Sequence, residues 1–287
     1  MRHFLRSLIL MISLTAFAYL VTPSVTCARE PLTFAIHPYL PTIEVVERFM
    51  PLVNYLSRET GYPIEIQVSK NYQEHIQKVG RDEFDFAYVG PTPYVILVRQ
   101  FGRKPLLSRL EVNGSPTFHG YIIVRKDSSI LTIADLAGKK FAFVDPNSTM
   151  GHKVTRFMMW KEGVDVKDLS GYTFMGTHPN VALGVLVGDF DAGAVKEEVF
   201  HEYEKRGLRG LKKTPELSEH LFVTSTKMPD AEVQALRKAM YKLKESETGR
   251  NAITVIKSSA TGLVPVQDTD YDDLRDIMDA LEKIEVK

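Results

Sequence analysis

Residues 141–152 read Phe-Ala-Phe-Val-Asp-Pro-Asn-Ser-Thr-Met-Gly-His, an apolar run followed by turn-forming and hydroxyl residues. The apolar run predicts a strand, Asp145-Pro146-Asn147 predicts a turn, and helical spacing begins near Lys153. Ser148 and Thr149 would then cap a helix whose first backbone N–H groups have no intrahelical acceptor. Such a helix start carries partial positive charge and can bind an anion without Lys or Arg. The stretch therefore predicts an α/β fold with an anion site at a strand end, and simple helix capping is the alternative.

The composition is that of a globular chain long enough to form two hydrophobic cores. The chain has 287 residues, of which 44% are hydrophobic and 25% are charged. Its formal net charge is zero, because 36 Lys and Arg residues balance 36 Asp and Glu residues. Without an excess of basic residues, nucleic acid is not expected as a partner.

Residues 1–28 have the layout of a secretory signal peptide. Basic residues precede an uncharged apolar run from Leu8 to Val21, and small residues follow this run. The run is short for a membrane span, so we expect cleavage near Ala28 and an exported, periplasmic protein. Two alternatives would keep the protein at a membrane: an uncleaved signal, or a lipid on Cys27, the only cysteine.

From residue 31 onward, short apolar strands alternate with helical segments, which is typical of parallel sheets covered by helices. Strands are predicted at residues 32–36, 64–68, 84–89, 121–124, 140–144, 172–175, 190–195 and 221–224, and helices at 44–60, 72–80, 132–137, 153–163, after 180, and at 231–246 and 271–284. The pattern restarts near residue 121. We therefore expect lobe 1 over residues 29–120, lobe 2 over 121–220, and a return segment over 221–287 that completes lobe 1. Hinge strands near residues 118–121 and 221–224 would join the lobes around a ligand cleft.

The sequence lacks the usual motifs of enzymes and metal centres. Seven histidines outside the leader are scattered instead of paired at metal-ligand spacing, and nucleophile and P-loop motifs are missing. We therefore predict no enzyme activity, no metal and no cofactor. His178 differs from the other histidines, because Gly176–Asn180 joins a strand to a helix as Ser148 and Thr149 do. Its imidazole could donate a hydrogen bond to an oxyanion, more strongly when protonated.

Four motifs in order resemble those of the phosphonate-binding proteins of ABC importers. They are Asp85-Phe86-Ala87-Tyr88 with Tyr94 beyond it, the stretch from Asp145 to Gly151, His178-x-Asn180-x-Ala182-Leu183, and Asp191-Ala192-Gly193-Ala194-Val195. The resemblance covers the chain from about Pro31 to the C-terminus. It implies a type II-like, two-lobed periplasmic binding protein, expected as a monomer. Such a protein closes on a phosphonate-, phosphate- or phosphite-like oxyanion and delivers it to an ABC permease.

The resemblance also implies roles for particular residues. Ser148 and Thr149, with the backbone N–H groups that follow them, would bind the oxyanion, and His178 would be a second donor. Tyr72 matches a site-lining tyrosine, although a half-buried helix aromatic is an equal alternative. The complete predicted ligand site is Ser148, Thr149, Met150, His178, Tyr94, Tyr72, Thr92, Glu198 and Tyr39.

Three positions depart from the family's pattern. Val89, next to Tyr88, stands where the family has a tyrosine, and Met150 replaces a small polar residue. In the aminophosphonate-binding branch two acids hold the ligand's amine. Glu198 matches the first acid, with a solvated helix acid as the alternative, whereas His220 stands at the position of the second. The resemblance therefore implies an intact oxyanion end and an incomplete amine end.

Two other classes of function stay open at this point. A periplasmic sensory subunit that reports ligand to a membrane kinase would have the same fold and the same site. An exported enzyme on this fold is less favoured, because no nucleophile, metal cluster or carboxylate pair accompanies the predicted anion site. The fold alone does not select among phosphorus oxyanions.

Overall fold

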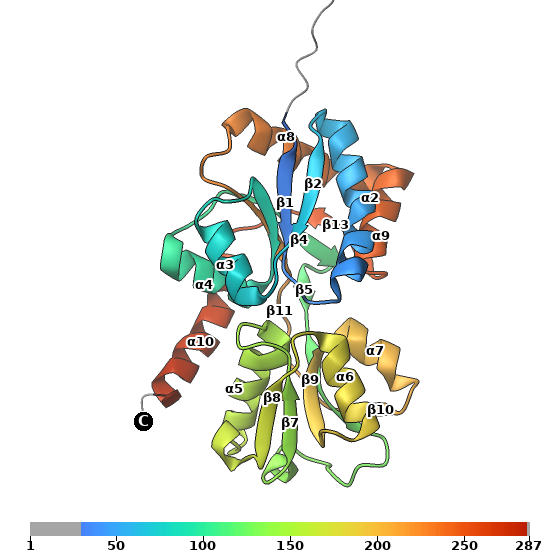
Figure 1. Cartoon of the computed structure of the whole chain (residues 1–287), viewed down its shortest axis with the longest axis vertical. Coiled ribbons are helices and arrows are strands. Elements are labelled where there is room, and N and C mark those ends of the chain that lie inside the picture. The colour runs from blue at the N-terminus through green and yellow to red at the C-terminus, as the bar shows by residue number, and fades with distance from the viewer. Residues whose placement is uncertain (1–29, 286–287) are drawn as a thin grey trace, which may run out of the picture. The chain divides into compact units, whose positions relative to one another are not determined.

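The computed structural model describes residues 30–285, so the predicted signal peptide, residues 1–28, lies outside the described residues. The chain from Pro31 onward forms one compact unit built on two separate β-sheets with helices packed against them (Figure 1). Within the described range, no helix combines the length and the apolar character that a membrane span requires.

The first sheet has six strands in the order β13-β4-β12-β3-β1-β2. Their bounds are β1 Leu32–Ile36, β2 Ile64–Val68, β3 Phe86–Val89, β4 Leu106–Val112, β12 Leu221–Thr224 and β13 Ala260–Val264. β1 pairs in parallel with β2 and β3, whereas β12 pairs antiparallel with β3 and β4. The expected parallel pairing is therefore present in β1, β2 and β3, whereas β12 and β13 pair antiparallel with their neighbours. The sheet is mixed because the chain re-enters it through β12 in the opposite direction.

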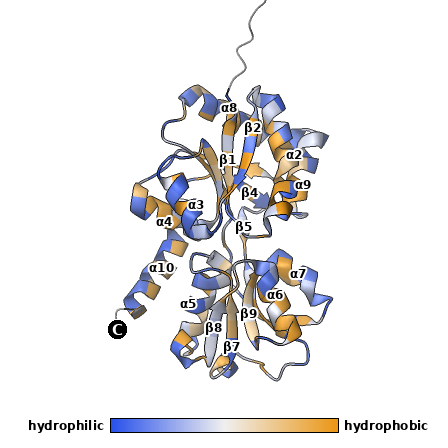
Figure 2. Cartoon of the chain, viewed as in Figure 1, coloured by the Kyte–Doolittle hydropathy of each residue, from blue (hydrophilic) through white to orange (hydrophobic). Residues whose placement is uncertain are grey.

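Helices cover both faces of the first sheet, because alternate side chains of its strands point to opposite faces. They are α2 Thr42–Thr60, α3 Tyr72–Gly80, α4 Pro91–Phe101, α8 Asp230–Lys242 and α9 Glu247–Ile256. Phe34 and Ile36 of β1 belong to the core that includes α2, α8 and α9, whereas Ala35 belongs to the core that includes α3 and α4. Apolar residues accordingly concentrate on the strands and on the inward sides of the helices (Figure 2).

The second sheet has five strands in the order β10-β6-β9-β7-β8. Their bounds are β6 Gly120–Arg125, β7 Lys140–Phe143, β8 Gly171–Phe174, β9 Ala192–Lys196 and β10 Leu208–Lys213, and the accompanying helices are α5 Val154–Lys161, α6 His178–Val187 and α7 Glu197–Glu204. β7 pairs in parallel with β8 and β9, whereas β6 pairs antiparallel with β9 and β10. The carboxyl ends of β7, β8 and β9 therefore lie together at one edge.

The chain passes between the two sheets at a short antiparallel ribbon of β5 (Thr117–Phe118) and β11 (Leu217–Ser218). The second predicted hinge, residues 221–224, is instead β12 inside the six-stranded sheet. The chain therefore completes its return to the first sheet at β11, just before the predicted hinge at residues 221–224. The last helix, α10 (Asp272–Glu285), contacts both α4 and α5 (Figure 1), so the C-terminal segment touches helices from both halves.

Candidate ligand site

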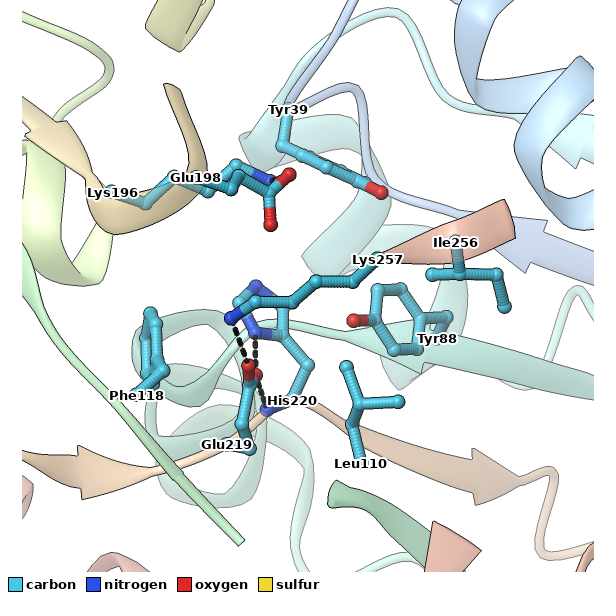
Figure 3. A pocket seen from close by; sticks show the side chains of 10 residues that line it. All are labelled: Tyr39, Tyr88, Leu110, Phe118, Lys196, Glu198, Glu219, His220, Ile256 and Lys257. Carbon is cyan, nitrogen blue, oxygen red and sulfur yellow. Dashed lines mark hydrogen bonds and ion pairs between the residues drawn. The ribbon is translucent and has the colours of Figure 1, made fainter. Parts of the chain in front are cut away.

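Two small adjoining cavities lie where residues of the two sheets meet. We call the first the hydroxyl cavity; it is lined by His37, Tyr39, Tyr72, Gly90, Pro93, Phe118, Ser148, Thr149, Met150, His178, Lys196 and His220. We call the second the carboxylate cavity; it is lined by Tyr39, Tyr88, Leu110, Phe118, Lys196, Glu198, Glu219, His220, Ile256 and Lys257 (Figure 3). Each has a volume of about 10 Å³, which is room for about one water molecule. The cleft is therefore closed in this structure.

The segment after β7 positions two hydroxyl groups at the hydroxyl cavity. Ser148 caps the helix start, and its Oγ accepts a hydrogen bond of 3.2 Å from the Gly151 amide. The helical stretch begins at Thr149 with a wide turn, Thr149–Lys153, that leads into α5, so it starts earlier than predicted. Glycine is required at position 151, because a Cβ there would collide with Val144 and lie 2.7 Å from Ser148 Oγ. The Ser148 bond uses only an oxygen lone pair, so the hydroxyl hydrogen can still be donated.

Thr149 joins this helix start to the first sheet's helices. Its Oγ1 accepts a hydrogen bond of 3.0 Å from the backbone amide of Thr92, near the start of α4. The Thr92 side chain does not line either cavity, and its buried hydroxyl has no partner within residues 30–285. The structure therefore brings Thr149 to the cavity and places Thr92 behind it.

Tyr94 is not brought to either cavity. Its hydroxyl donates a hydrogen bond of 2.7 Å to Asp268, and its ring lies 4.9 Å from the ring of Tyr271. The side chain is fully buried in the core below α4. Its position in the structure supports packing and not ligand contact.

His178, the first residue of α6, reaches the hydroxyl cavity with a defined tautomer. Its Nδ1 accepts a hydrogen bond of 3.1 Å from the Lys196 amide, which leaves the ring proton on Nε2 as a donor. Burial lowers the pKa of His178 well below its ordinary value, and the charges of Lys196 and His220 lower it further. The expectation that His178 acts more strongly when protonated does not fit this geometry, because Nδ1 already accepts a hydrogen bond.

Aromatic rings close the walls of both cavities. Tyr72 lines the hydroxyl cavity, and burial raises its pKa, so the phenol remains a neutral donor. Tyr39 lines both cavities. Tyr88, next to Val89, lines the carboxylate cavity with its side chain, whereas Val89 packs in the opposite core.

Buried ion pairs dominate the carboxylate cavity. Lys196 Nζ lies 2.6 Å from Glu198, and Lys257 Nζ lies 3.1 Å from Glu219 and also pairs with Glu197. His220 Nδ1 lies 2.6 Å from Glu219. Burial opposes ionisation of Glu219, but the charges of Lys257 and His220 outweigh it and hold the pKa of Glu219 well below its usual range. Figure 3 shows the Lys257 and His220 side chains converging on this carboxylate.

A family model described as "ABC transporter, phosphonate, periplasmic substrate-binding protein" matches residues 34–271. The chain belongs to this family. The family resemblance stated from the sequence is therefore confirmed, and so is the two-lobed α/β class of fold. The protein is a periplasmic phosphonate-binding component of an ABC importer, with a small-molecule ligand and an ABC permease as its partners.

Individual relatives show the same similarity. The phosphate-import protein PhnD of Mycolicibacterium smegmatis is 26% identical over 274 residues, which cover 87% of this chain and 85% of that protein. The structure of PhnD1 from Prochlorococcus marinus, in complex with methylphosphonate, superposes with a TM-score of 0.80 at 19% identity, covering 88% of this chain and 98% of that one. A binding component of a Pseudomonas aeruginosa ABC phosphonate transporter gives a TM-score of 0.79 at 21% identity, with 87% and 86% covered.

The site of this family member contains residues that the sequence prediction omitted. Lys196 ends β9 at its carboxyl edge, one residue after the last motif quoted from the sequence, so its strand-end position was a usable signal. Lys257 follows α9, a helix that was not predicted, and no local pattern links it to Glu219. Within residues 30–285, no group of three or more His, Cys, Asp or Glu residues is placed to hold a metal ion.

Proposed function

We propose that the protein captures a phosphate-, phosphite- or phosphonate-like oxyanion in the hydroxyl cavity and delivers it to the permease. The observation that carries this proposal is the convergence of neutral donors from separate strand ends. Ser148 and Thr149 follow β7, and His178 follows β8, yet all three line one cavity. Tyr72 adds a phenol from the other sheet's α3.

The chemistry of these groups suits an anion that must bind and later leave. The helix start after Ser148 carries the positive end of the helix dipole. Hydrogen bonds to a charged oxygen are about twice as strong as neutral ones, and exclusion of water strengthens them further. Ser148, Thr149 and His178 are all at least 95% buried, so a ligand held there would be shielded from solvent.

Ligand entry requires the cleft to open, since the closed cavity has a volume of only about 10 Å³. We propose that lobe 1, residues 29–120, and lobe 2, residues 121–220, separate at the ribbon of β5 and β11, where the chain crosses twice between the sheets. Residues 221–287 would complete lobe 1. The relatives support the ligand class, because one is named for phosphate import and another was solved with methylphosphonate.

A thermal-unfolding screen with inorganic phosphate, phosphite and methylphosphonate tests the ligand class. A ligand present at 100 times its dissociation constant should add about 2.7 kcal/mol to the free energy of unfolding. A rise in Tm with at least one of the three oxyanions is expected. If none of them raises Tm, the proposed function is wrong.

The double variant Ser148→Ala/Thr149→Ala tests the place of binding. It should weaken oxyanion binding by about 2–4 kcal/mol, because two hydrogen bonds to a charged group are lost and water compensates in part. The matched control is Ser246→Ala, since Ser246 caps α9 with a 3.0 Å bond from the Gly249 amide, far along the chain from the cavity. Both caps contribute to stability, but only the Ser148 and Thr149 change should reduce affinity in calorimetry. Unchanged affinity in the double variant would place the ligand elsewhere.

A further inference from the structure

Lys196 places a buried ammonium group between the two cavities. It is the last residue of β9 and the residue immediately before α7, and it is 6% exposed. Together with Tyr39, Phe118 and His220, it lines both the hydroxyl and the carboxylate cavity. A ligand bound by Ser148 and Thr149 would therefore contact Lys196 if it extended toward Glu198.

The surroundings of Lys196 Nζ have the chemistry of an alkylammonium site. The Glu198 carboxylate lies 2.6 Å from Nζ, and the ring centroid of Tyr39 lies 3.8 Å from it. A carboxylate beside an aromatic face is the arrangement that binds ammonium groups, by charge-assisted hydrogen bonding and cation–π attraction. Figure 3 shows the three side chains on the same side of the carboxylate cavity. The protein's own lysine thus occupies a site suited to a ligand's amine.

The remaining charges of the carboxylate cavity are also paired. Two lysines, Lys196 and Lys257, face two carboxylates, Glu198 and Glu219. Glu219 additionally binds His220, and Arg48 lies 3.5 Å from Glu198. No carboxylate lining this cavity is left without a cation among the described residues. An incoming ammonium would have to displace Lys196 or lie beside it.

We propose that Lys196 is a specificity-determining residue that fills the ammonium position from within, so that the protein accepts phosphorus oxyanions with no substituent or a small uncharged one and rejects phosphonates that carry an amine. This inference rests on the proposed function, because it assumes that the oxyanion binds at Ser148 and Thr149. The same ammonium group adds positive charge near the ligand's oxygens, which favours the anion itself. Rejection follows from like-charge repulsion and from the pairing that displacement of Lys196 would break.

Two ligands of matched shape test the proposal. Propylphosphonate and aminoethylphosphonate have chains of equal length and differ by a terminal methyl against an ammonium group. Calorimetry on the mature wild-type protein should show propylphosphonate binding at least about tenfold more tightly. If aminoethylphosphonate binds as tightly or more tightly, the proposal is wrong, and this result needs no variant.

Substitutions of Lys196 sharpen the test. Lys196→Ala empties the ammonium position and leaves Glu198 able to pair with a ligand, so the affinity ratio should shift toward aminoethylphosphonate by at least about tenfold. Lys196→Arg keeps the positive charge and should keep the wild-type preference. The matched control is Lys104→Ala, which removes another buried lysine that is 5% exposed and lies 2.7 Å from Asp82; it should leave the ratio unchanged.

The outcomes separate this inference from the proposed function. If inorganic phosphate, phosphite and methylphosphonate all fail to bind wild-type protein, the proposed function is wrong and the inference is wrong with it. If they bind but a folded Lys196→Ala variant keeps the wild-type ratio, only the role of Lys196 is overturned. If Lys196→Ala does not fold, the wild-type ratio and the Lys196→Arg ratio decide, because a gain of amine binding in Lys196→Arg also contradicts the proposal.

Discussion

The hydroxyl cavity and the carboxylate cavity share four lining residues but differ in how they treat charge. The hydroxyl cavity presents neutral donors, namely the hydroxyls of Ser148 and Thr149 and the imidazole of His178, and its one lysine, Lys196, is paired with Glu198. The carboxylate cavity holds buried ions that are already paired with one another, such as Glu219 with Lys257. Under the proposed function, an anion would enter and leave the hydroxyl cavity without breaking a buried ion pair. In the carboxylate cavity, removal of one member of a pair would leave a buried ion without its counter-charge.

The largest expected effect concerns the ion pairs of the carboxylate cavity. Glu219→Gln should lower the free energy of unfolding by about 3–5 kcal/mol, because removal of one partner leaves a buried ion without its counter-charge. Glu219 is 1% exposed and contacts both Lys257 and His220. Chemical denaturation of the variant and the wild type measures the difference.

An exposed ion pair provides the control for Glu219→Gln. Asp279, whose side chain is 52% exposed, pairs with Arg99 on the surface, and Asp279→Asn should cost about 0–1 kcal/mol. Similar losses for the two variants would mean that the carboxylate cavity is no more dependent on its charges than the surface is. The contrast between the two cavities would then fail.

The second prediction concerns the hydroxyl cavity. His178→Ala should weaken oxyanion binding by about 1.5–3 kcal/mol, the range for a hydrogen bond to a charged group. The loss should be the same from about pH 6 to about pH 8, because burial holds the pKa of His178 well below its ordinary value and Nε2 donates in the neutral form. Calorimetry at each pH, expressed as the ratio of wild-type to variant affinity, removes the ligand's own titration. A loss that grows as the pH falls would show that His178 acts as a cation.

The polar residues of the hydroxyl cavity could be predicted from the sequence because they lie in short, continuous motifs. Asp145–Gly151 contains the strand end, the turn and the cap within one short stretch, and the second donor, His178, has the same setting one strand later. The bounds of β1, β2 and α3 match the predicted segments, since each has a clear apolar period and Asn71 caps α3. Family membership followed from the same short motifs.

The carboxylate cavity could not be predicted in this way, because its ion pairs join segments that are far apart in the chain. Lys257 and Glu219 are 38 residues apart, and Arg48 reaches Glu198 across 150 residues. No spacing rule connects such positions. Tyr94 failed to reach the cavity for the same reason: its hydroxyl partner, Asp268, lies 174 residues away. Alternation of strands and helices also could not reveal that β12 runs antiparallel, because direction depends on where the chain re-enters the sheet.

The smallest expected effect tests whether the imidazole of His152, in the helix start next to the hydroxyl cavity, stays neutral in the folded protein. His152 belongs to the wide turn Thr149–Lys153, where its Nδ1 donates a 2.8 Å hydrogen bond to the Pro146 carbonyl and its ring packs edge-on against Phe143 and Phe174. Burial, followed by the charge of Lys153, lowers the pKa of His152 to about 3. In the unfolded chain the pKa is about 6.5. The unfolded state therefore binds the proton first, so this stabilisation is complete above about pH 6.5 and is lost as the pH falls toward 3.

His152→Gln should reduce the pH dependence of the unfolding free energy by up to about 1.4 kcal/mol per pH unit between about pH 6.5 and about pH 5. Glu219 contributes little in this window, because the unfolded-state pKa of a glutamate, about 4.3, lies below it and the folded-state pKa of Glu219 is held lower still. The control is His201→Gln, which removes an imidazole whose side chain is 58% exposed. Denaturation curves at several pH values give the slopes. Equal slopes for wild type and His152→Gln would mean that folding does not hold the His152 imidazole neutral, which would contradict a neutral helix start next to the hydroxyl cavity.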